Sequence, residues 1–172
     1  MSNLFWIDLE MTGLSVDTEV IIETAAIVTD AQFKELSTFE AVVKQPQIYL
    51  DRMDDWNKKH HSESGLVAKI PNGRDPLDVQ TDLSQLVTEF FPNKKAKPIL
   101  AGNSIGQDRL FINKYFPDFA QQLHYRMLDV TSWKIIFNSR NIEFKKKNKH
   151  RALDDIRESI EELKFYISHF KI

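Results

Sequence analysis

Asp8 and Glu10 are two carboxylates separated by one residue inside an apolar and aromatic stretch. Side chains two positions apart in a strand point to the same face, so both acids would share one face. The preceding Phe5, Trp6 and Ile7 favour a central strand, which is apolar on both faces. Two adjacent carboxylates repel each other unless something neutralises them. The pair therefore indicates a cation site, and the alternative is an edge strand that carries two acids toward solvent.

Asp108 is a third candidate because helical phasing places it on a buried face. Ser104 and Gln107 form a Ser-x-x-Gln capping box, which predicts a helix from Ser104 to Phe116. Apolar or aromatic residues stand three, four and seven positions after Asp108, so this acid lies within the apolar stripe of the helix. An ionised group in that position needs a partner. The alternative is that Asp108 only interacts favourably with the helix dipole.

The segment from Ala152 to Phe170 supplies a fourth acid and is preceded by a histidine. Its apolar residues alternate at spacings of three and four, which predicts a helix with one buried stripe. Asp155 falls on the flank of that stripe, whereas Asp154 and Glu158 point nearly opposite to it and should be solvated. His150, five residues before Asp155, would lie on the incoming loop and face the same cleft. The alternative for His150 is an ordinary surface histidine.

Together these positions provide four oxygen ligands, from Asp8, Glu10, Asp108 and Asp155, and one imidazole, from His150. Carboxylate oxygens are ligands for hard cations such as Mg²⁺ and Mn²⁺. Two such ions roughly 3.5 to 4 Å apart can bracket a phosphate and stabilise its attacking and leaving oxygens. The imidazole would take a proton from the attacking water. The pattern is that of a phosphodiesterase with two divalent cations.

The elements that must position these residues predict an α/β protein with a mixed sheet. Hairpin-connected strands come first and alternating helices and strands follow, an order that builds helices against one sheet. The polar stretch from Asp51 to Gly65 and the Asn72-Gly73 turn allow only short helices between them. Strands are predicted over 4–9, 20–29, 38–44, 98–102 and 125–130, and longer helices over 77–91, 104–116 and 152–170.

Length and composition favour a single domain, residues 1–172, with one sizeable core. The 23 Lys and Arg nearly balance the 25 Asp and Glu, so the net charge of -2 excludes a strongly basic surface for long nucleic acid. A short substrate fits this charge better. The chain has no Cys, which excludes thiolate metal sites and Cys nucleophiles. No apolar run approaches the roughly 18 residues of a membrane span, so we expect a cytoplasmic protein.

Three short motifs carry a resemblance to a known family. They are Ile7-Asp8-Leu9-Glu10-Met11-Thr12-Gly13-Leu14, Gly102-Asn103-Ser104-Ile105-Gly106-Gln107-Asp108 and His150-Arg151-Ala152-Leu153-Asp154-Asp155-Ile156-Arg157-Glu158-Ser159. In this order they resemble the acidic motifs of the DEDDh exonucleases, which act in the 3′-to-5′ direction and have a ribonuclease H-like fold. The resemblance implies three α/β/α layers around a central, mixed, five-stranded sheet. Its His-x-x-x-x-Asp spacing also selects Asp155 as the metal ligand.

Other segments are similar to the oligoribonuclease branch of that family. They are Trp56 with the stretch 61–66, and the stretch 124–126 followed by 128–130. The similarity implies a homodimer that binds short RNA, and aromatic and apolar faces suit base stacking without strong sequence preference. The implied contacts are base contacts by Leu14, Trp56 and His61, binding of the 5′ phosphate by Ser104 and Arg126, and contact of Tyr125 with the partner's active site. Leu14 and Trp56 could alternatively be core residues.

Three hypotheses follow from these observations. The leading one is an exoribonuclease that degrades very short RNA, especially dinucleotides, to 5′-mononucleotides. The second is a broader DEDDh exonuclease that acts on single-stranded DNA or longer RNA, and the third is a catalytically silent nucleotide-binding module. The connection from Asp129 to His150 is shorter than the family pattern implies and carries Lys145, Lys146, Lys147 and Lys149. Such a run is usually a solvated loop that would steer an anionic substrate electrostatically, and the alternative is a direct contact with the substrate phosphates.

Overall fold

One five-stranded sheet organises the computed structural model, which describes residues 3–93, 96–145 and 152–170. The strands lie in the spatial order β3-β2-β1-β4-β5, with β1 in the centre. β1 and β3 are antiparallel to β2, whereas β4 is parallel to both β1 and β5. This confirms the mixed five-stranded sheet. The strands are β1 (Leu4–Met11), β2 (Ile21–Thr29), β3 (Glu35–Val42), β4 (Ile99–Gly102) and β5 (Met127–Asp129).

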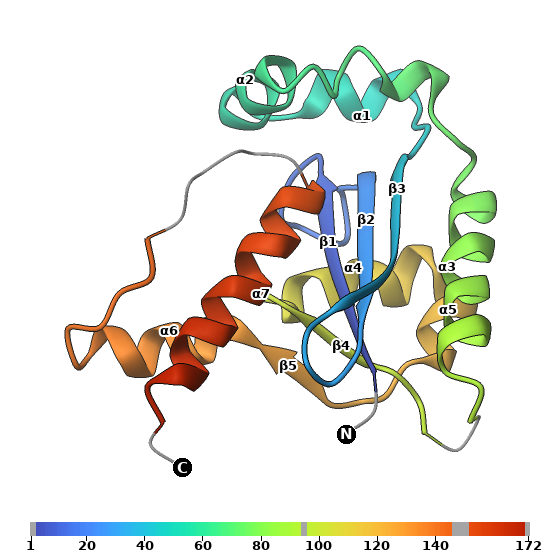
Figure 1. Cartoon of the computed structure of the whole chain (residues 1–172). Helices are drawn as coiled ribbons and strands as arrows, with labels where there is room; N and C mark the ends of the chain where they lie inside the picture. The colour runs from blue at the N-terminus through green and yellow to red at the C-terminus, as the bar shows by residue number, and fades with distance from the viewer. Residues whose placement is uncertain (1–2, 94–95, 146–151, 171–172) are drawn as a thin grey trace.

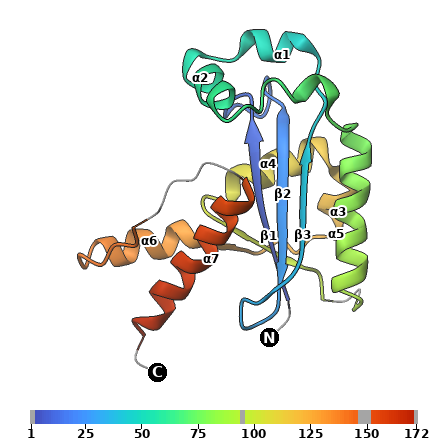
Figure 2. The same cartoon turned by 45° about the horizontal axis from the view of Figure 1, so that its top comes forward.

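Helices cover both faces of this sheet, as Figures 1 and 2 show. The side chains of α3, α4 and α5 form one apolar cluster with one face, and those of α6 and α7 form a second cluster with the other. The three α/β/α layers are therefore present. The helices are α1 (Gln47–Arg52), α2 (Asp55–Glu63), α3 (Pro76–Phe90), α4 (Gly106–Tyr115), α5 (Pro117–Gln122), α6 (Val130–Asn138) and α7 (Ala152–Ser168), with a 3₁₀ turn over Ile70–Asn72.

Alternation along β1 decides which helices its side chains meet. Phe5, Ile7 and Leu9 belong to the cluster with α3, α4 and α5, whereas Leu4 and Trp6 belong to the cluster with α7. Asp8 and Glu10 continue the second series, so both acids face the side of the sheet that α7 covers. The prediction that they share one face follows directly from this alternation.

The helices α1 and α2 lie across one end of the sheet (Figure 2). They are short, as the polar stretch around Trp56 predicted, and they lie over a small apolar cluster of their own. Asp54 begins α2 by accepting a hydrogen bond from the Asn57 amide. This end of the sheet is where β1 finishes, so α2 lies beside the acids at the end of β1.

The start of α4 differs from the prediction. The helix begins at Gly106, and the side chain of Ser104, a residue with a φ of 50°, makes no capping hydrogen bond to it. Its N–H is instead shared by Asp129 Oδ1 and Thr131 Oγ1, each at 2.9 Å. The side-chain amide of Gln107 donates to the carbonyl of Leu14 and not to the N–H side of the helix start, as a capping box would require. The capping box was therefore wrong, because polar groups from a distant segment compete for the same backbone.

Helix α6 was not predicted from the sequence, which placed nothing helical between the strand at 125–130 and the last helix. α6 occupies 130–138, and the side chain of the preceding Asp129 accepts a hydrogen bond from Thr131 N. Among the residues that the structure describes, no helix combines the length and the apolar character needed to cross a bilayer.

Candidate active site

Three carboxylates meet where β1 ends and α7 begins. Asp8 and Glu10 come from β1 and Asp155 from the first turn of α7, and one oxygen of each lies within 4.8 Å of the other two. All three side chains are half-buried. Carboxylate oxygens are the donors that hard divalent cations prefer, so this donor set fits Mg²⁺ or Mn²⁺. The acidic cluster indicates a site for divalent metal ions.

Asp108 reaches the same end of β1 from the opposite face of the sheet. Its Oδ1 accepts a hydrogen bond of 3.0 Å from the backbone N–H of Leu9, the residue between Asp8 and Glu10. β4 pairs with β1 over Leu4 to Trp6, so Leu9 lies beyond that pairing, and the Asp108 carboxylate occupies the edge that β4 leaves. Asp108 is 7% exposed, which confirms its position within the apolar stripe of α4.

Crowding and burial raise the pKa of two of these acids. Burial is the main reason why the pKa of Glu10 rises to about 7, and the charges of Glu23, Asp155 and Asp108 add to it. Burial also raises the pKa of Asp108 to about 7, although the hydrogen bond from Leu9 opposes the rise. Near neutral pH the site therefore favours either protons or cations, and a divalent cation would compete with the protons.

Glu23 is a nearby acid that the sequence reasoning missed. It lies directly opposite Glu10 across the β1–β2 pairing. The two side chains line a cavity of about 170 Å³ together with Glu40, His60 and Lys69. The sequence does show Glu23 as an acid inside the strongly apolar strand 20–29. Its position opposite Glu10, however, depends on the register between the two strands. Register between distant strands is not visible in a single strand pattern.

His61 lies against the end of β1. Its Nε2 is 3.0 Å from the carbonyl oxygen of Met11, and its Nδ1 is 3.9 Å from Glu10 Oε2. The ring is 2% exposed, and burial lowers its pKa, so the neutral form is favoured. His61 thus belongs to the immediate surroundings of the acidic cluster.

Leu14 and Trp56 are both exposed, at 76% and 69% respectively, so neither is a core residue. The ring of Trp56 stacks on His60 with centroids 4.9 Å apart and an interplanar angle of 10°. Large exposed apolar side chains beside an acidic cluster are typical of binding surfaces. The alternative that these two residues simply fill the core is therefore wrong.

Side chains of α4 hold the β1–β2 loop that carries Leu14. Gln107 Nε2 donates to the Leu14 carbonyl at 2.6 Å, and Lys114 Nζ donates to the Val16 carbonyl at 2.6 Å. The hydroxyl of Tyr115 donates to the carbonyl of Glu19, also at 2.6 Å. Because the loop backbone is fastened at several points, Leu14 is presented to solvent on a supported loop.

The remaining predicted contact residues lie in the β4–α4 loop, which holds Ser104, and just before β5, where Tyr125 and Arg126 stand. Ser104, Tyr125 and Arg126 are all exposed. The ring of Tyr125 stacks on His124 at 4.5 Å, and the Arg126 guanidinium lies 5.3 Å from the centre of the Tyr125 ring. These three side chains are accessible to a ligand or a partner.

The predictions for His150, before α7, and for Asp154 and Glu158, on α7, remain to be compared with the structure. His150 lies outside the described residues. Asp154 is half-buried, with a side chain 36% exposed and an ion pair of 3.6 Å to Arg157. Glu158 was expected in solvent but is also half-buried, and its Oε2 is inaccessible to solvent. The reason is that α7 packs along β1 and β2 over a wider arc than its apolar stripe, and even Glu162 is fully buried.

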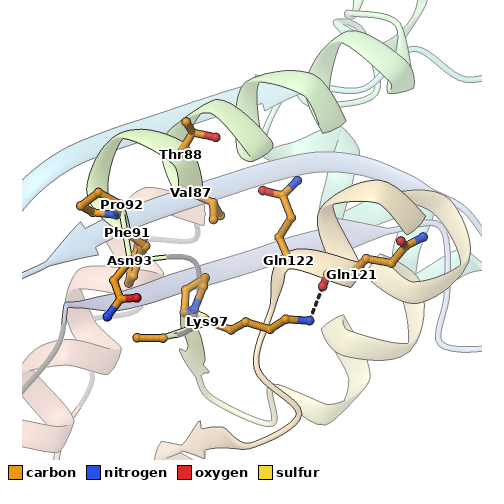
Figure 3. A pocket seen from close by; sticks show the side chains of 10 residues that line it. Val87, Thr88, Phe91, Pro92, Asn93, Lys97, Gln121 and Gln122 are labelled. Carbon is orange, nitrogen blue, oxygen red and sulfur yellow. Dashed lines mark hydrogen bonds between the residues drawn. The ribbon is translucent and has the colours of Figure 1, made fainter.

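A separate cavity of about 530 Å³ lies near the opposite end of β1 (Figure 3). It is bounded by Val87 and Phe91 of the α3 end and by Lys97, whose Nζ donates to the Gln121 carbonyl. The adjoining β4 starts at Ile99, which pairs with Leu4 at the start of β1. None of the predicted site residues that the structure describes lines this cavity, so it is distinct from the acidic cluster.

Known proteins are similar to this chain in sequence or in fold. An oligoribonuclease of Francisella tularensis subsp. tularensis (strain WY96-3418) is 44% identical over 168 residues, 95% of this chain and 93% of its own length. One of Shewanella putrefaciens is 43% identical over 178 residues, covering 100% and 98%. Exonuclease I of Methylocaldum szegediense has a similar fold, with a TM-score of 0.74 at 12% identity over 98% of this chain.

The exonuclease I likeness concerns the fold alone, since the chain spans about two fifths of those proteins, 41% of the Methylocaldum chain. Exonuclease I of E. coli, solved with a dA16 oligonucleotide, gives the same TM-score of 0.74 at 13% identity. Residues 5–163 match the RNase_T family, described as exonuclease. The near-complete length of the oligoribonuclease matches makes the assignment specific. The chain belongs to the RNase_T exonuclease family and, within it, to the oligoribonucleases.

Proposed function

We propose that this protein is a 3′-to-5′ exoribonuclease that degrades very short RNA, especially dinucleotides, to 5′-mononucleotides. The observation that carries the proposal is the cluster of Asp8, Glu10 and Asp155 at the end of β1, in a chain that is 43–44% identical to oligoribonucleases over nearly its whole length. A net charge of -2 agrees with a substrate that offers few phosphates.

Two divalent cations, Mg²⁺ or Mn²⁺, would be held by Asp8, Glu10, Asp108 and Asp155. Bound cations supply Lewis-acid stabilisation of charge on the phosphate oxygens and favour deprotonation of the attacking water. The role of Asp108 is supported by the hydrogen bond that its carboxylate accepts from Leu9, the residue between Asp8 and Glu10, although Asp108 is not one of the three acids of the cluster. His150 would accept the proton of the water, and the support for it is its sequence position five residues before Asp155.

The RNA would lie over the exposed residues around the acidic cluster. Leu14 and Trp56 offer apolar faces for the bases, and His61 borders the same site next to Glu10. Ser104 and Arg126 would bind the 5′ phosphate at the other end of a dinucleotide. A closed cap around this phosphate would exclude longer chains sterically and so limit the substrate to short RNA.

We further propose a homodimer in which Tyr125 contributes to the partner's active site, supported by its 75% exposure. We also propose that residues 1–172 form one exonuclease domain, since β1 from the N-terminal part packs against α7 from the C-terminal part. The cytoplasmic location stays a prediction that cell fractionation would test.

Cleavage of labelled RNA of defined length tests the proposed function. Purified protein with Mn²⁺ should degrade an RNA dimer with a kcat/KM at least about tenfold above that for a 10-mer RNA. Equal turnover of dimer and 10-mer, or of a DNA oligomer, would favour the broader exonuclease instead. The Asp8→Ala variant serves as the control, and Mn²⁺-dependent cleavage that survives in it would exclude this site. No cleavage of any oligomer by the wild-type protein would favour the non-catalytic module.

A further inference from the structure

Glu162 is a carboxylate in a place where an apolar side chain would serve packing better. It lies on α7, it is fully buried, and the same helix face packs against Trp6, Val130 and Phe137. Burial of an ionised group is costly, and apolar replacement of buried charged groups is often neutral or stabilising. Stability alone therefore does not explain a glutamate at this position.

The contacts of Glu162 lead from α7 to the β4–α4 loop. Its Oε1 accepts a hydrogen bond of 3.0 Å from the Tyr166 hydroxyl, and its Oε2 accepts one of 3.2 Å from Asn103 Nδ2. The same Asn103 amide donates to Ser159 Oγ at 2.8 Å. Ser159 Oγ in turn donates to the backbone carbonyl of Asp155 at 2.9 Å. The Asn103 amide therefore binds two successive turns of α7, through Glu162 and Ser159. Ser159 continues the chain of hydrogen bonds to the backbone of Asp155.

The other side of Asn103 leads to the loop before α4. Its Oδ1 accepts a hydrogen bond of 3.4 Å from the Thr131 hydroxyl, which also accepts the N–H of Ser104 at 2.9 Å. Ser104, whose N–H Thr131 shares with Asp129, has a φ of 50°, a left-handed conformation that is uncommon for a residue other than glycine. Asn103 thus stands between the loop that leads into the Asp108 helix and the helix that carries Asp155.

We propose that Glu162, acting through Asn103 and Ser159, is a positioning device that sets the first turn of α7 against the Ser104 loop. It rests on the proposed function in so far as Asp155 is taken as a metal ligand. α4 and α7 cover opposite faces of the sheet, so the packing of each helix on β1 relates the two acids only through the sheet. The polar network from Glu162 to Thr131 fixes that relation at the sheet edge.

The network explains why a carboxylate suits this position better than a neutral group. The amide of Asn103 must direct its two hydrogens toward α7 while its oxygen receives the Thr131 hydroxyl, because an amide has donors on one side only. A carboxylate accepts hydrogen bonds at both oxygens and donates none, so it fixes the orientation of this amide. A leucine in place of Glu162 would leave the amide with one partner fewer and a less certain orientation.

The Glu162→Leu variant tests the proposal, with Glu161→Leu as the matched control. Glu161 is exposed on the next position of the same helix and pairs with Lys164 at 2.8 Å, so the control makes the same substitution away from the network. Mn²⁺ binding would be measured by calorimetry without RNA, kcat by cleavage of an RNA dimer, and stability by urea unfolding in EDTA. Loss of the buried carboxylate and loss of the acceptor for the Tyr166 hydroxyl have opposite effects on stability, so Glu162→Leu should unfold at a similar or lower urea concentration but stay folded without urea. It should bind Mn²⁺ about tenfold more weakly and show a lower kcat.

Two further variants sharpen the result and cover a failure of Glu162→Leu to fold. Ser159→Ala removes the hydrogen bond to the Asp155 carbonyl together with the one that Ser159 accepts from Asn103, and it should weaken Mn²⁺ binding about threefold to tenfold. Glu162→Gln keeps the side-chain length and one oxygen that can accept from Asn103, so it should restore part of the Mn²⁺ affinity that Glu162→Leu loses.

The outcomes separate this proposal from the proposed function. Wild-type Mn²⁺ affinity in both Glu162→Leu and Ser159→Ala would overturn the positioning role, as would equal weakening in Glu161→Leu. If the wild-type protein cleaves no RNA but Mn²⁺ binding still weakens in the network variants, the function fails and the positioning role stands.

Discussion

The helices α4 and α7 bring one acid each to the end of β1, from opposite faces of the sheet, and they do so in different ways. Asp108 is buried in the apolar face of α4, and its carboxylate is bound directly to the backbone of β1. Asp155 is half-buried in the first turn of α7. Its backbone carbonyl accepts a hydrogen bond from Ser159, which begins the polar network through Asn103 to Glu162. One acid is fixed by the strand itself, and the other by side chains at a distance.

This difference indicates at which positions a substitution should change both the stability and the activity of the protein. Changes at Asp108 alter a buried hydrogen bond and a buried charge, so they affect folding and catalysis together. Changes on the α7 side alter the position of an acid that is partly in solvent, so they should affect catalysis while leaving the free energy of unfolding nearly unchanged. The following experiments are designed to break or sharpen this contrast, beginning with the largest expected effect.

Removal of Asp155 should abolish most of the activity without loss of stability. A metal ligand contributes to several kcal/mol of transition-state stabilisation, so Asp155→Ala should reduce kcat/KM on an RNA dimer by roughly a thousandfold. The free energy of unfolding in EDTA should stay equal or rise, because one charge of a crowded cluster is gone. The neighbouring Asp154→Ala, which removes an ion pair with Arg157, is the control and should keep its activity within about twofold. An equal loss in both variants would contradict the choice of Asp155.

At Asp108, two substitutions should separate the charge from the hydrogen bond. Asp108→Asn keeps an oxygen that can accept from Leu9 N–H but removes the charge, so activity should fall roughly a hundredfold with stability kept or raised. Asp108→Ala also leaves that buried N–H unpaired, which should cost about 1–3 kcal/mol of unfolding free energy. Urea unfolding in EDTA and cleavage of an RNA dimer measure the two effects. Identical stability of the two variants would show that the Leu9 contact contributes little.

The raised pKa values of Glu10 and Asp108 predict how pH acts on the metal-free protein. Both are about 7 in the folded state, above the values near 4 of the unfolded chain, so the folded state binds these protons more tightly. Stability in EDTA should therefore fall as pH rises from about 4 to about 7. Mn²⁺ binds the deprotonated acids, so its stabilising effect should be larger at pH 8 than at pH 5. Thermal unfolding with Mn²⁺ and with EDTA at both pH values measures this, and an equal Mn²⁺ effect would contradict it.

The sequence predicted the acids well because their placement depends on local periodicity. A period of two puts Asp8 and Glu10 on one face, and a period of 3.6 puts Asp108 in the apolar stripe of α4. Helical phasing also chose Asp155 over Asp154, and the cluster contains Asp155. The sheet and its three layers followed from the order of strands and helices and from the family resemblance.

The errors arose where distant segments compete with local rules. Ser104 is a good N-cap by type, but Asp129 and Thr131 take its N–H and the helix starts later. Glu23 became visible only through its register with Glu10. The burial of Glu162 depends on how α7 crosses the sheet, which no periodicity of α7 itself encodes. Non-local contacts of this kind require the folded structure.

Substitution of Trp56 addresses the exposed side of the site. Base stacking contributes about 1–3 kcal/mol per base, so Trp56→Ala should raise KM for an RNA dimer about fivefold to a hundredfold with a smaller effect on kcat. Because the side chain is 69% exposed, the free energy of unfolding should change by less than about 0.5 kcal/mol. Exposed Ile48→Ala, on α1, is the control and should leave KM unchanged. A fall in kcat with an unchanged KM would argue against a stacking role.

The smallest effect is expected at the surface contact between α7 and β3. Arg157 Nε and one terminal nitrogen bind the two carboxylate oxygens of Glu35 at 2.9 and 3.1 Å, but both side chains are more than one third exposed. Such pairs contribute about 0.2–1 kcal/mol and are screened by salt, so Arg157→Ala should change stability by no more than this and less in high salt. Activity and Mn²⁺ affinity should not change. If they fell as far as in Glu162→Leu, α7 would be set from its surface rather than through the buried network, and the contrast between the two helices would disappear.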